Sequence, residues 1–269
     1  MLQKNHVHNM DCLDGFKLLD DNSCDMLFSD WPYGTTQCQW DVPLPLDQIW
    51  PEIKRVVKPN GAIVLFSAQP FTTDLIVSNR KMFRYEIIWE KTQAAGFLNA
   101  KKMPLRTHEN ILVFYQKLPT YNPIMWQAET KSRGGSHTGR NGKMADRYLG
   151  TARKQVENRA ANYNGIGAST YHDTGMRFPT DVIQFSSWNG ALFGKTDNAT
   201  KHPTQKPVDL CEYIIKTYSN PGDTVLDNCA GSGSIPLAAK NTGRQFYAFE
   251  MDAKFCEIAN SRVARMPRC

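Results

Sequence analysis

The 269-residue chain lacks any apolar run approaching the roughly 20 residues that a membrane-spanning helix needs. Residues 1–6 contain no apolar core of a secretory signal. The seven cysteines are scattered, odd in number and without a Cys-x-x-Cys pair, which argues against a disulfide framework and against a structural zinc site. We therefore expect a cytoplasmic protein with reduced thiols, no metal and no membrane partner.

A strong bias of composition is also missing, because 41% of the residues are hydrophobic and 22% are charged, which argues against wholesale disorder. The charge is nevertheless unevenly placed. Residues 131–159 hold eight cations and two acids, so that 8 − 2 = +6 equals the net charge of the whole chain. This stretch predicts an inserted, partly flexible lobe that faces a polyanion, and a solvated loop without a partner is the alternative.

Outside the basic lobe, strand and helix patterns alternate along the chain. The strands are expected at residues 5–11, 26–30, 62–66, 84–89, 110–115, 224–226 and 245–249, and the helices at 13–19, 43–58, 71–79, 207–219, 235–241 and 253–263. The fully apolar run 62–66 is typical of a parallel strand covered on both faces. Pro59-Asn60-Gly61 predicts the end of the helix before it. The order indicates an α/β domain with a parallel sheet.

The first chemical motif follows the apolar run 26–28 and reads Ser29-Asp30-Trp31-Pro32-Tyr33. Asp30 offers a carboxylate acceptor, and Pro32 biases Trp31 towards an extended backbone whose carbonyl is a second acceptor. The ring of Tyr33 offers a flat face for stacking. Two acceptors and a stacking face suit an exocyclic amine on a nucleobase, although for these few residues alone a strand that runs into a turn is the better explanation.

The second motif, Asp227-Asn228-Cys229-Ala230-Gly231-Ser232-Gly233-Ser234, lies between an expected strand and an expected helix. Its glycines allow a close approach by a ligand, and Glu250 ends the next strand, where it can accept hydrogen bonds from a ribose diol. Pro236 stands where a dinucleotide fingerprint needs a third glycine, and no Gly-Lys-Ser/Thr of a phosphate loop follows. A cofactor with a ribose but no pyrophosphate, S-adenosylmethionine, fits better than NAD.

Three motifs in this order resemble the β group of amino DNA methyltransferases. Asp30-Trp31-Pro32-Tyr33 matches the family's catalytic Asp-Pro-Pro-Tyr, and 227–233 matches its glycine motif. His202-Pro203-Thr204-Gln205-Lys206-Pro207 matches a third signature without a break, and Asn9-Met10-Asp11-Cys12 matches the strand end that meets the cofactor adenine. The resemblance covers roughly residues 5–117 and 200–265. Trp31 departs from the family's first proline, and Cys229 departs from a phenylalanine against the cofactor.

The resemblance implies a Rossmann-like methyltransferase fold with a largely parallel seven-stranded sheet, permuted motif order and an inserted target-recognition lobe. Residues 1–117 are then the catalytic half, 118–200 the lobe and 201–269 the cofactor-binding half. The implied reaction moves a methyl group from S-adenosylmethionine to the N6 amine of a flipped adenine in DNA. The alternatives are cytosine N4 as the target and a DNA-binding homologue with weakened catalysis; an NAD-linked oxidoreductase is disfavoured.

The resemblance also assigns site residues and partners. The catalytic residues are Asp30, Trp31, Pro32 and Tyr33. The cofactor contacts are Asp11, Cys12, Asp30, Thr204, Lys206, Asp227, Asn228, Cys229, Ala230, Gly231, Ser232, Gly233, Glu250 and Met251. The basic lobe contributes DNA contacts through Arg133, Arg140, Lys143, Arg147, Arg153 and Lys154. Double-stranded DNA is the expected partner in a bacterial or phage-infected cell, with a second copy of the chain and a cognate restriction nuclease as further family partners.

Overall fold

The computed structural model describes residues 2–34, 41–127, 176–186 and 205–264. The chain divides into two units, Met1–Asn122 with Asp181–Cys269, and Pro123–Thr180. In the second unit, the described residues form a short antiparallel pair, β6 (Trp126–Gln127) with β7 (Met176–Arg177). The predicted division of the chain at residues 118 and 200 remains a prediction.

The first unit is built on one sheet with the strand order β1-β10-β9-β2-β3-β5-β4-β8. Its strands are β1 (His6–Asn9), β2 (Cys24–Ser29), β3 (Val57–Ser67), β4 (Phe83–Ala95), β5 (Arg106–Phe114), β8 (Val182–Phe185), β9 (Thr224–Asp227) and β10 (Gln245–Glu250). Only β5 runs antiparallel to its neighbours. The largely parallel sheet is confirmed, but it has eight strands rather than seven, because β8 from the stretch predicted as the lobe pairs with β4.

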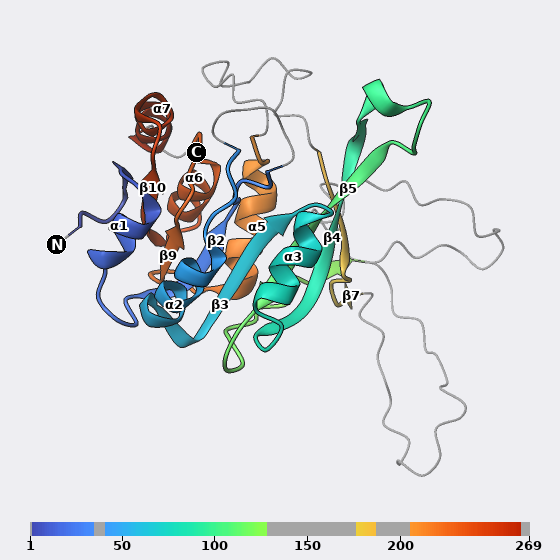
Figure 1. The fold of residues 1–269 in the computed structure, drawn as a ribbon. Coiled ribbons are helices and arrows are strands. Elements are labelled where there is room, and N and C mark those ends of the chain that lie inside the picture. The colour runs from blue at the N-terminus through green and yellow to red at the C-terminus, as the bar shows by residue number, and fades with distance from the viewer. Residues whose placement is uncertain (1, 35–40, 128–175, 187–204, 265–269) are drawn as a thin grey trace, which may run out of the picture. The chain divides into compact units, whose positions relative to one another are not determined.

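Two groups of helices cover the sheet. One group is α1 (Cys12–Lys17), α2 (Leu46–Val56) and α3 (Phe71–Ser78), and the other is α5 (Val208–Tyr218), α6 (Ser234–Asn241) and α7 (Ala253–Ala264). Figure 1 shows α2 and α3 in front of β3 and α5 behind it. Met26, Leu27 and Phe28 of β2 are fully buried, as a strand covered on both faces requires.

The residues predicted to end α2, Pro59-Asn60-Gly61, instead lie within β3. The helix runs directly into β3, whose first residue Val57 already has extended backbone angles. Cys24 pairs with Val57 but Met26 pairs with Ala62, so residues 58–61 bulge out of the ladder. A side chain on Gly61 would come within 2.6 Å of the Asp25 carbonyl oxygen, which explains why glycine stands there.

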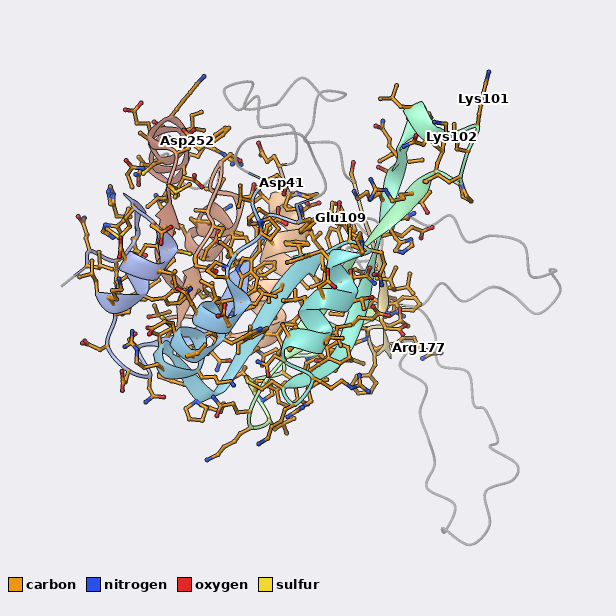
Figure 2. All side chains as sticks on the ribbon, in the orientation of Figure 1. Asp41, Lys101, Lys102, Glu109, Arg177 and Asp252 are labelled. Carbon is orange, nitrogen blue, oxygen red and sulfur yellow. The ribbon has the colours of Figure 1, made fainter. Side chains whose placement is uncertain are left out.

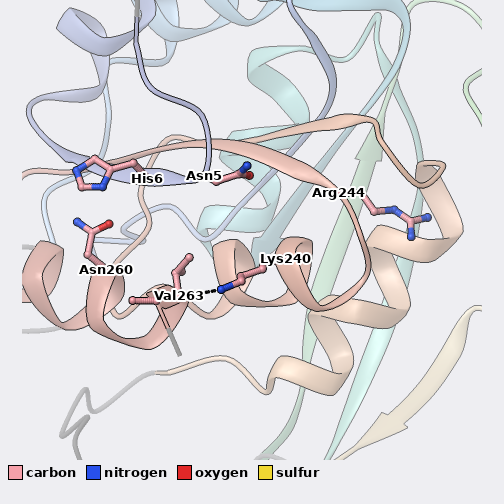
Figure 3. A pocket seen from close by; sticks show the side chains of 7 residues that line it. Asn5, His6, Lys240, Arg244, Asn260 and Val263 are labelled. Atoms are coloured by element: carbon pink, nitrogen blue, oxygen red, sulfur yellow. Dashed lines mark hydrogen bonds between the residues drawn. The ribbon is translucent and has the colours of Figure 1, made fainter. Parts of the chain in front are cut away.

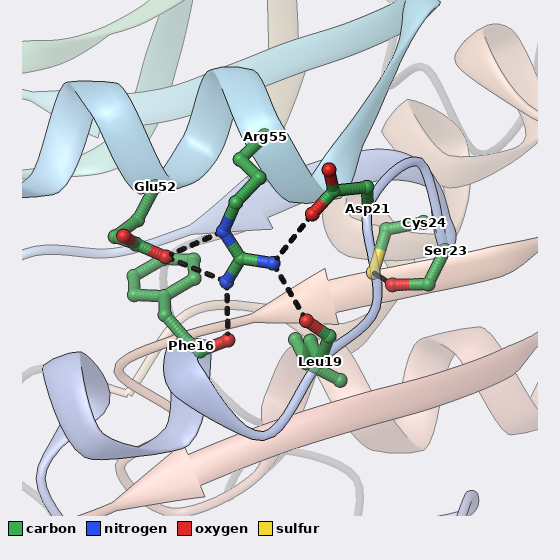
Figure 4. Close-up of polar contacts among 7 residues, drawn as sticks. All are labelled: Phe16, Leu19, Asp21, Ser23, Cys24, Glu52 and Arg55. Atoms are coloured by element: carbon green, nitrogen blue, oxygen red, sulfur yellow. Dashed lines mark hydrogen bonds and ion pairs between the residues drawn. The ribbon is translucent and has the colours of Figure 1, made fainter.

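Arg55 joins α2 to the end of α1 (Figure 4). Its guanidinium donates to the carbonyl oxygens of Phe16 and Leu19, both at 2.7 Å, at and just beyond the end of α1. The same group pairs with Asp21 at 2.9 Å and with Glu52 at 2.6 Å. This contact holds α1, and with it the strand end at Asp11, against α2.

Candidate active site

The carboxyl ends of the parallel strands bring the predicted motifs to one edge of the sheet. Asn9 at the end of β1 pairs with Glu250 at the end of β10, and β9, which ends at Asp227, lies between β10 and β2. Asp30 follows the last residue of β2. Strands far apart in the sequence therefore place their acidic ends together, which is where ligands bind in sheets of this kind.

Both oxygens of the Asp30 carboxylate are held. The Tyr33 hydroxyl donates to Oδ1 at 2.9 Å, and the Lys206 ammonium donates to Oδ2 at 2.6 Å. Burial raises the pKa of the Asp30 carboxyl above its ordinary value, the charge of Lys206 opposes that shift, and Glu109 adds to it. The signature around Lys206 predicts a cofactor contact, whereas the structure places its ammonium on the Asp30 carboxylate.

Lys206 belongs to a buried chain of alternating charges. Its Nζ lies 3.4 Å from Glu109 Oε2, and Lys91 Nζ contacts the other oxygen of Glu109. The charges of Asp30, Lys206, Glu109 and Lys91 cancel, so the site is neutral overall. Burial alone would raise the pKa of Glu109 and lower that of Lys206, but the opposite charges outweigh burial and shift both pKa values the other way. The shifted pKa values favour the charged forms of Glu109 and Lys206.

The ring of Tyr33 contacts both an aromatic ring and a cation. Its ring stacks on Phe71 of α3, with 5.3 Å between centroids and 23° between planes. Lys206 Nζ lies 5.6 Å from the same ring. Phe71 is therefore a neighbour of the site that the motif did not reveal, because it comes from a different helix. The use of Tyr33 as a stacking surface for a base remains a prediction.

The side chain of Trp31 explains how the chain tolerates its departure from proline. The indole is 2% exposed, meets Trp50 edge to face, and donates from Nε1 to Asn228 Oδ1 at 2.8 Å. Beside it, the Ser29 hydroxyl donates to Asp227 Oδ1 at 2.7 Å. Two buried hydrogen bonds therefore tie the strand end at residues 29–31 to the glycine turn, and the indole supplies a restraint that a proline ring cannot.

We expect Trp31→Phe to lower kcat about tenfold for the methyl transfer that the resemblance implies. Without this restraint, the backbone carbonyl of residue 31 can move. The substitution should also destabilise the fold by about 1–3 kcal/mol, because Asn228 Oδ1 loses its donor in a buried position. Trp50→Phe is the matched control, since Trp50 donates its indole proton to Ser78 at 2.8 Å. Steady-state kinetics and urea unfolding check the pair. An equal loss of kcat in both variants would show that Trp31 acts through packing alone.

The glycine turn is shaped by two residues with left-handed backbone angles. Gly231 has φ of 50° and Gly233 has φ of 80°, and a side chain on Gly233 would come within 2.7 Å of the Ala259 Cβ. The carboxylate of Glu250 accepts from the amide of Gly231 at 2.7 Å and from the amide of Asp252 at 2.8 Å. Residues 229–233 thus form a backbone cradle beside Glu250.

The remaining predicted cofactor contacts lie around this cradle, except Thr204. Asp11 caps α1 by accepting from the Leu13 amide at 2.8 Å, and the buried Cys12 hydrogen-bonds with Cys229, which lowers the Cys12 pKa. Ser232 is buried and Met251 is 71% exposed. Thr204 lies outside the described residues, as do the six predicted DNA contacts of the basic lobe.

Comparison with known proteins shows the family to which the chain belongs. A family model described as DNA methylase, of the N6/N4 methyltransferase type, matches residues 24–261. The chain belongs to this family. It is 29% identical to the type II methyltransferase M1.MboII of Moraxella bovis, over 97% of this chain and 96% of that protein. It is 26% identical to the DNA adenine methyltransferase YhdJ of Escherichia coli K12, over 97% and 82%.

Solved structures show the same fold. The M1.HpyAVI–SAM complex aligns with a TM-score of 0.59 at 21% identity, over 97% of this chain and 99% of that one. The cytosine-N4-specific PvuII DNA methyltransferase aligns with a TM-score of 0.61 at 15% identity, over 98% and 89%. The fold of this DNA methylase is therefore that of S-adenosylmethionine-dependent DNA methyltransferases.

A surface hollow of this methylase lies away from these motifs (Figure 3). It has a volume of about 380 Å³ and is lined by Asn5, His6, Lys240, Arg244, Asn260, Val263 and Ala264. Its lining includes the first residue of β1 and residues that precede β10, so it faces the amino ends of the strands. Among the described residues, no group of His, Cys, Asp and Glu is arranged to hold a metal ion, and no helix is long and apolar enough to span a membrane.

Burial raises the pKa of Asp227 from 3.8 to about 7. A carboxyl whose pKa is higher in the folded state adds stability at low pH, and that contribution is lost as pH rises from about 4 to about 7. In the methylase without cofactor, we therefore expect the free energy of unfolding to fall by a few kcal/mol over this range, and Asp227→Asn to remove most of the fall. Urea unfolding at several pH values checks this, and equal slopes in both proteins would contradict it.

Proposed function

We propose that this methylase transfers a methyl group from S-adenosylmethionine to the N6 amine of an adenine flipped out of double-stranded DNA in the bacterial or phage-infected cytoplasm. The observation that carries the proposal is the Asp30 carboxylate, held by Tyr33 and Lys206 at the end of β2 and tied through Trp31 to the glycine turn. YhdJ, a relative over nearly the whole chain, is named as an adenine methyltransferase.

The residues of the glycine turn fit the cofactor. Asp227 Oδ2 is a buried acceptor without a hydrogen-bond partner among the described residues, and Glu250 is held beside the cradle by two backbone amides. Asp11, Glu250 and the backbone of residues 229–233 would hold the nucleoside part. When bound, S-adenosylmethionine supplies an electrophilic methyl group on a sulfonium.

The chain's own residues then activate the amine. The amine of adenine is a poor nucleophile because its lone pair is delocalised into the ring. Hydrogen bonds to the Asp30 carboxylate and the Trp31 carbonyl localise that pair and stabilise the positive charge that develops on nitrogen. Asp30 then accepts the proton that the methylated amine must lose. Lys206 holds the carboxylate in place, and Glu109 balances the charge of Lys206 so that it does not oppose the developing cation.

Transfer of labelled methyl from S-adenosylmethionine to unmethylated double-stranded DNA, followed by nucleoside mass spectrometry, tests the proposal. We expect N6-methyladenine. Formation of N4-methylcytosine would keep the mechanism and change the base, an outcome that the fold shared with the PvuII cytosine-N4 enzyme makes worth resolving. No transfer despite measurable binding of cofactor and DNA would favour a binding homologue. The lobe's phosphate contacts, a dimer and a partner nuclease stay predictions.

A further inference from the structure

The hairpin made by β4 and β5 continues beyond the sheet as an arm, defined here as residues 92–106. The two strands pair regularly from Tyr85 with Val113 to Glu90 with His108, shift register, and pair again at Ala95 with Arg106. A short 3-10 turn, η1 (Phe97–Asn99), forms the tip, and Gly96 before it has φ of 92°. Figure 1 shows this green hairpin standing out from the sheet.

The charge of the arm has one sign. Residues 92–106 contain Lys101, Lys102 and Arg106 and no acidic residue. All three cations are exposed, and none takes part in an ion pair among the described residues. Figure 2 shows Lys101 and Lys102 at the end of the arm, away from the body of the sheet. A surface that carries only positive charge attracts phosphate groups.

Apolar side chains share the tip with these cations. Leu98 is 100% exposed, Phe97 69% and Met103 57%. Single exposed apolar residues are ordinary, but three within seven positions of a projecting hairpin indicate a contact surface. Apolar side chains flanked by Lys and Arg are the combination with which proteins enter a DNA groove and press against base pairs.

The arm also begins beside the active site. β5 leads from Arg106 to Glu109, which lies 3.4 Å from Lys206, the residue bonded to Asp30. Three residues of strand span about 10 Å. A duplex that has delivered a base to Asp30 extends well beyond that distance on both sides, since one helical turn is about 34 Å.

We propose that the arm is a DNA-contacting element separate from the basic lobe: Lys101, Lys102 and Arg106 bind phosphates beside the flipped nucleotide, and Phe97 and Leu98 pack against the groove there. The inference rests on DNA being the substrate, as proposed above. DNA is favoured over a second copy of the chain, because two arms that carry only positive charge repel each other. Binding to DNA would pair the three exposed cations of the arm with phosphates.

The charge is tested with Lys101→Glu/Lys102→Glu. We expect its Kd for unmethylated duplex DNA to rise at least tenfold and the slope of log K against log salt to become shallower by about 2, since two phosphate contacts are lost. Lys54→Glu/Lys117→Glu is the control with the same charge change, because both lysines are exposed and Lys117 follows the opposite end of β5. That control should change Kd less than threefold. Calorimetry should show unchanged affinity for S-adenosylmethionine in both.

The apolar tip is tested with Leu98→Ser. We expect about a tenfold higher KM for DNA, an unchanged salt slope and an unchanged Tm, because a fully exposed leucine adds nothing to folding. Leu118→Ser, at a position 79% exposed beyond the other end of β5, is the matched control. Arm variants that bind DNA like their controls would overturn the proposal, and a change of oligomeric state alone would assign the arm to self-association. A wild-type protein that neither binds nor methylates DNA would instead overturn the proposed function.

Discussion

Asp30→Asn is expected to lower kcat for methyl transfer about a thousandfold, while the affinity for S-adenosylmethionine stays within about twofold. Asparagine has nearly the same shape as aspartate: its side-chain oxygen can still accept from Lys206, and its Nδ2 can donate to the hydroxyl oxygen of Tyr33. It carries no negative charge, however, and therefore cannot stabilise the cation that develops on the amine or take up its proton. The loss consequently falls on the chemical step and not on binding.

Single-turnover methyl transfer and calorimetric titration of the cofactor measure the two quantities separately. Asp20→Asn is a matched control, because it makes the same chemical change at an exposed residue. That variant should keep full activity. If Asp30→Asn retained activity within tenfold of wild type, the carboxylate would not be the group that activates the amine, and the Trp31 carbonyl would carry the role alone.

The parts of this site that the sequence predicts are local. Asp30 and the glycine turn each follow a short apolar strand, and a strand followed by a turn fixes where its next few residues lie. The β2 and β9 strands could likewise be predicted, because their burial on both faces leaves short apolar runs. Each of these signals is contained within about ten neighbouring residues.

The remaining features depend on contacts between distant residues. Lys206 and Asp30 are separated by 176 positions, so the signature around Lys206 shows that the residue matters but not which group it touches. No local pattern in the sequence places Glu109 or Lys91 beside Lys206. The arm was missed because its residues lack the regular alternation of a half-buried strand, and β8 because its four residues lie in a stretch without periodic pattern.

Lys206→Met is expected to lower kcat about a hundredfold near neutral pH, with partial recovery as pH rises. Removing the ammonium leaves the Asp30 and Glu109 carboxylates without the cation between them, and like charges in a buried site raise each other's pKa. Asp30 acts only when ionised. The acid limb of the kcat profile should therefore move to higher pH, because a raised pKa shifts ionisation in that direction. Lys206→Arg, which keeps the charge, should restore most of the activity.

The same variant separates two roles for Lys206. If the ammonium holds Asp30, as its 2.6 Å contact indicates, the KM for S-adenosylmethionine stays within about threefold and the pH profile moves. If it instead binds the cofactor, as the signature suggests, that KM rises and the pH profile stays in place.

Adding Glu109→Gln to Lys206→Met should then recover part of the lost activity, because it removes the negative charge that raises the Asp30 pKa. Glu109→Gln alone should lower kcat, because Lys206 would then bind Asp30 more tightly and keep the carboxylate from the amine. A double variant no more active than Lys206→Met at any pH would show that Lys206 does not act through the charge of Asp30. The sign of this coupling therefore distinguishes a balanced charge chain from a lysine that merely fills space.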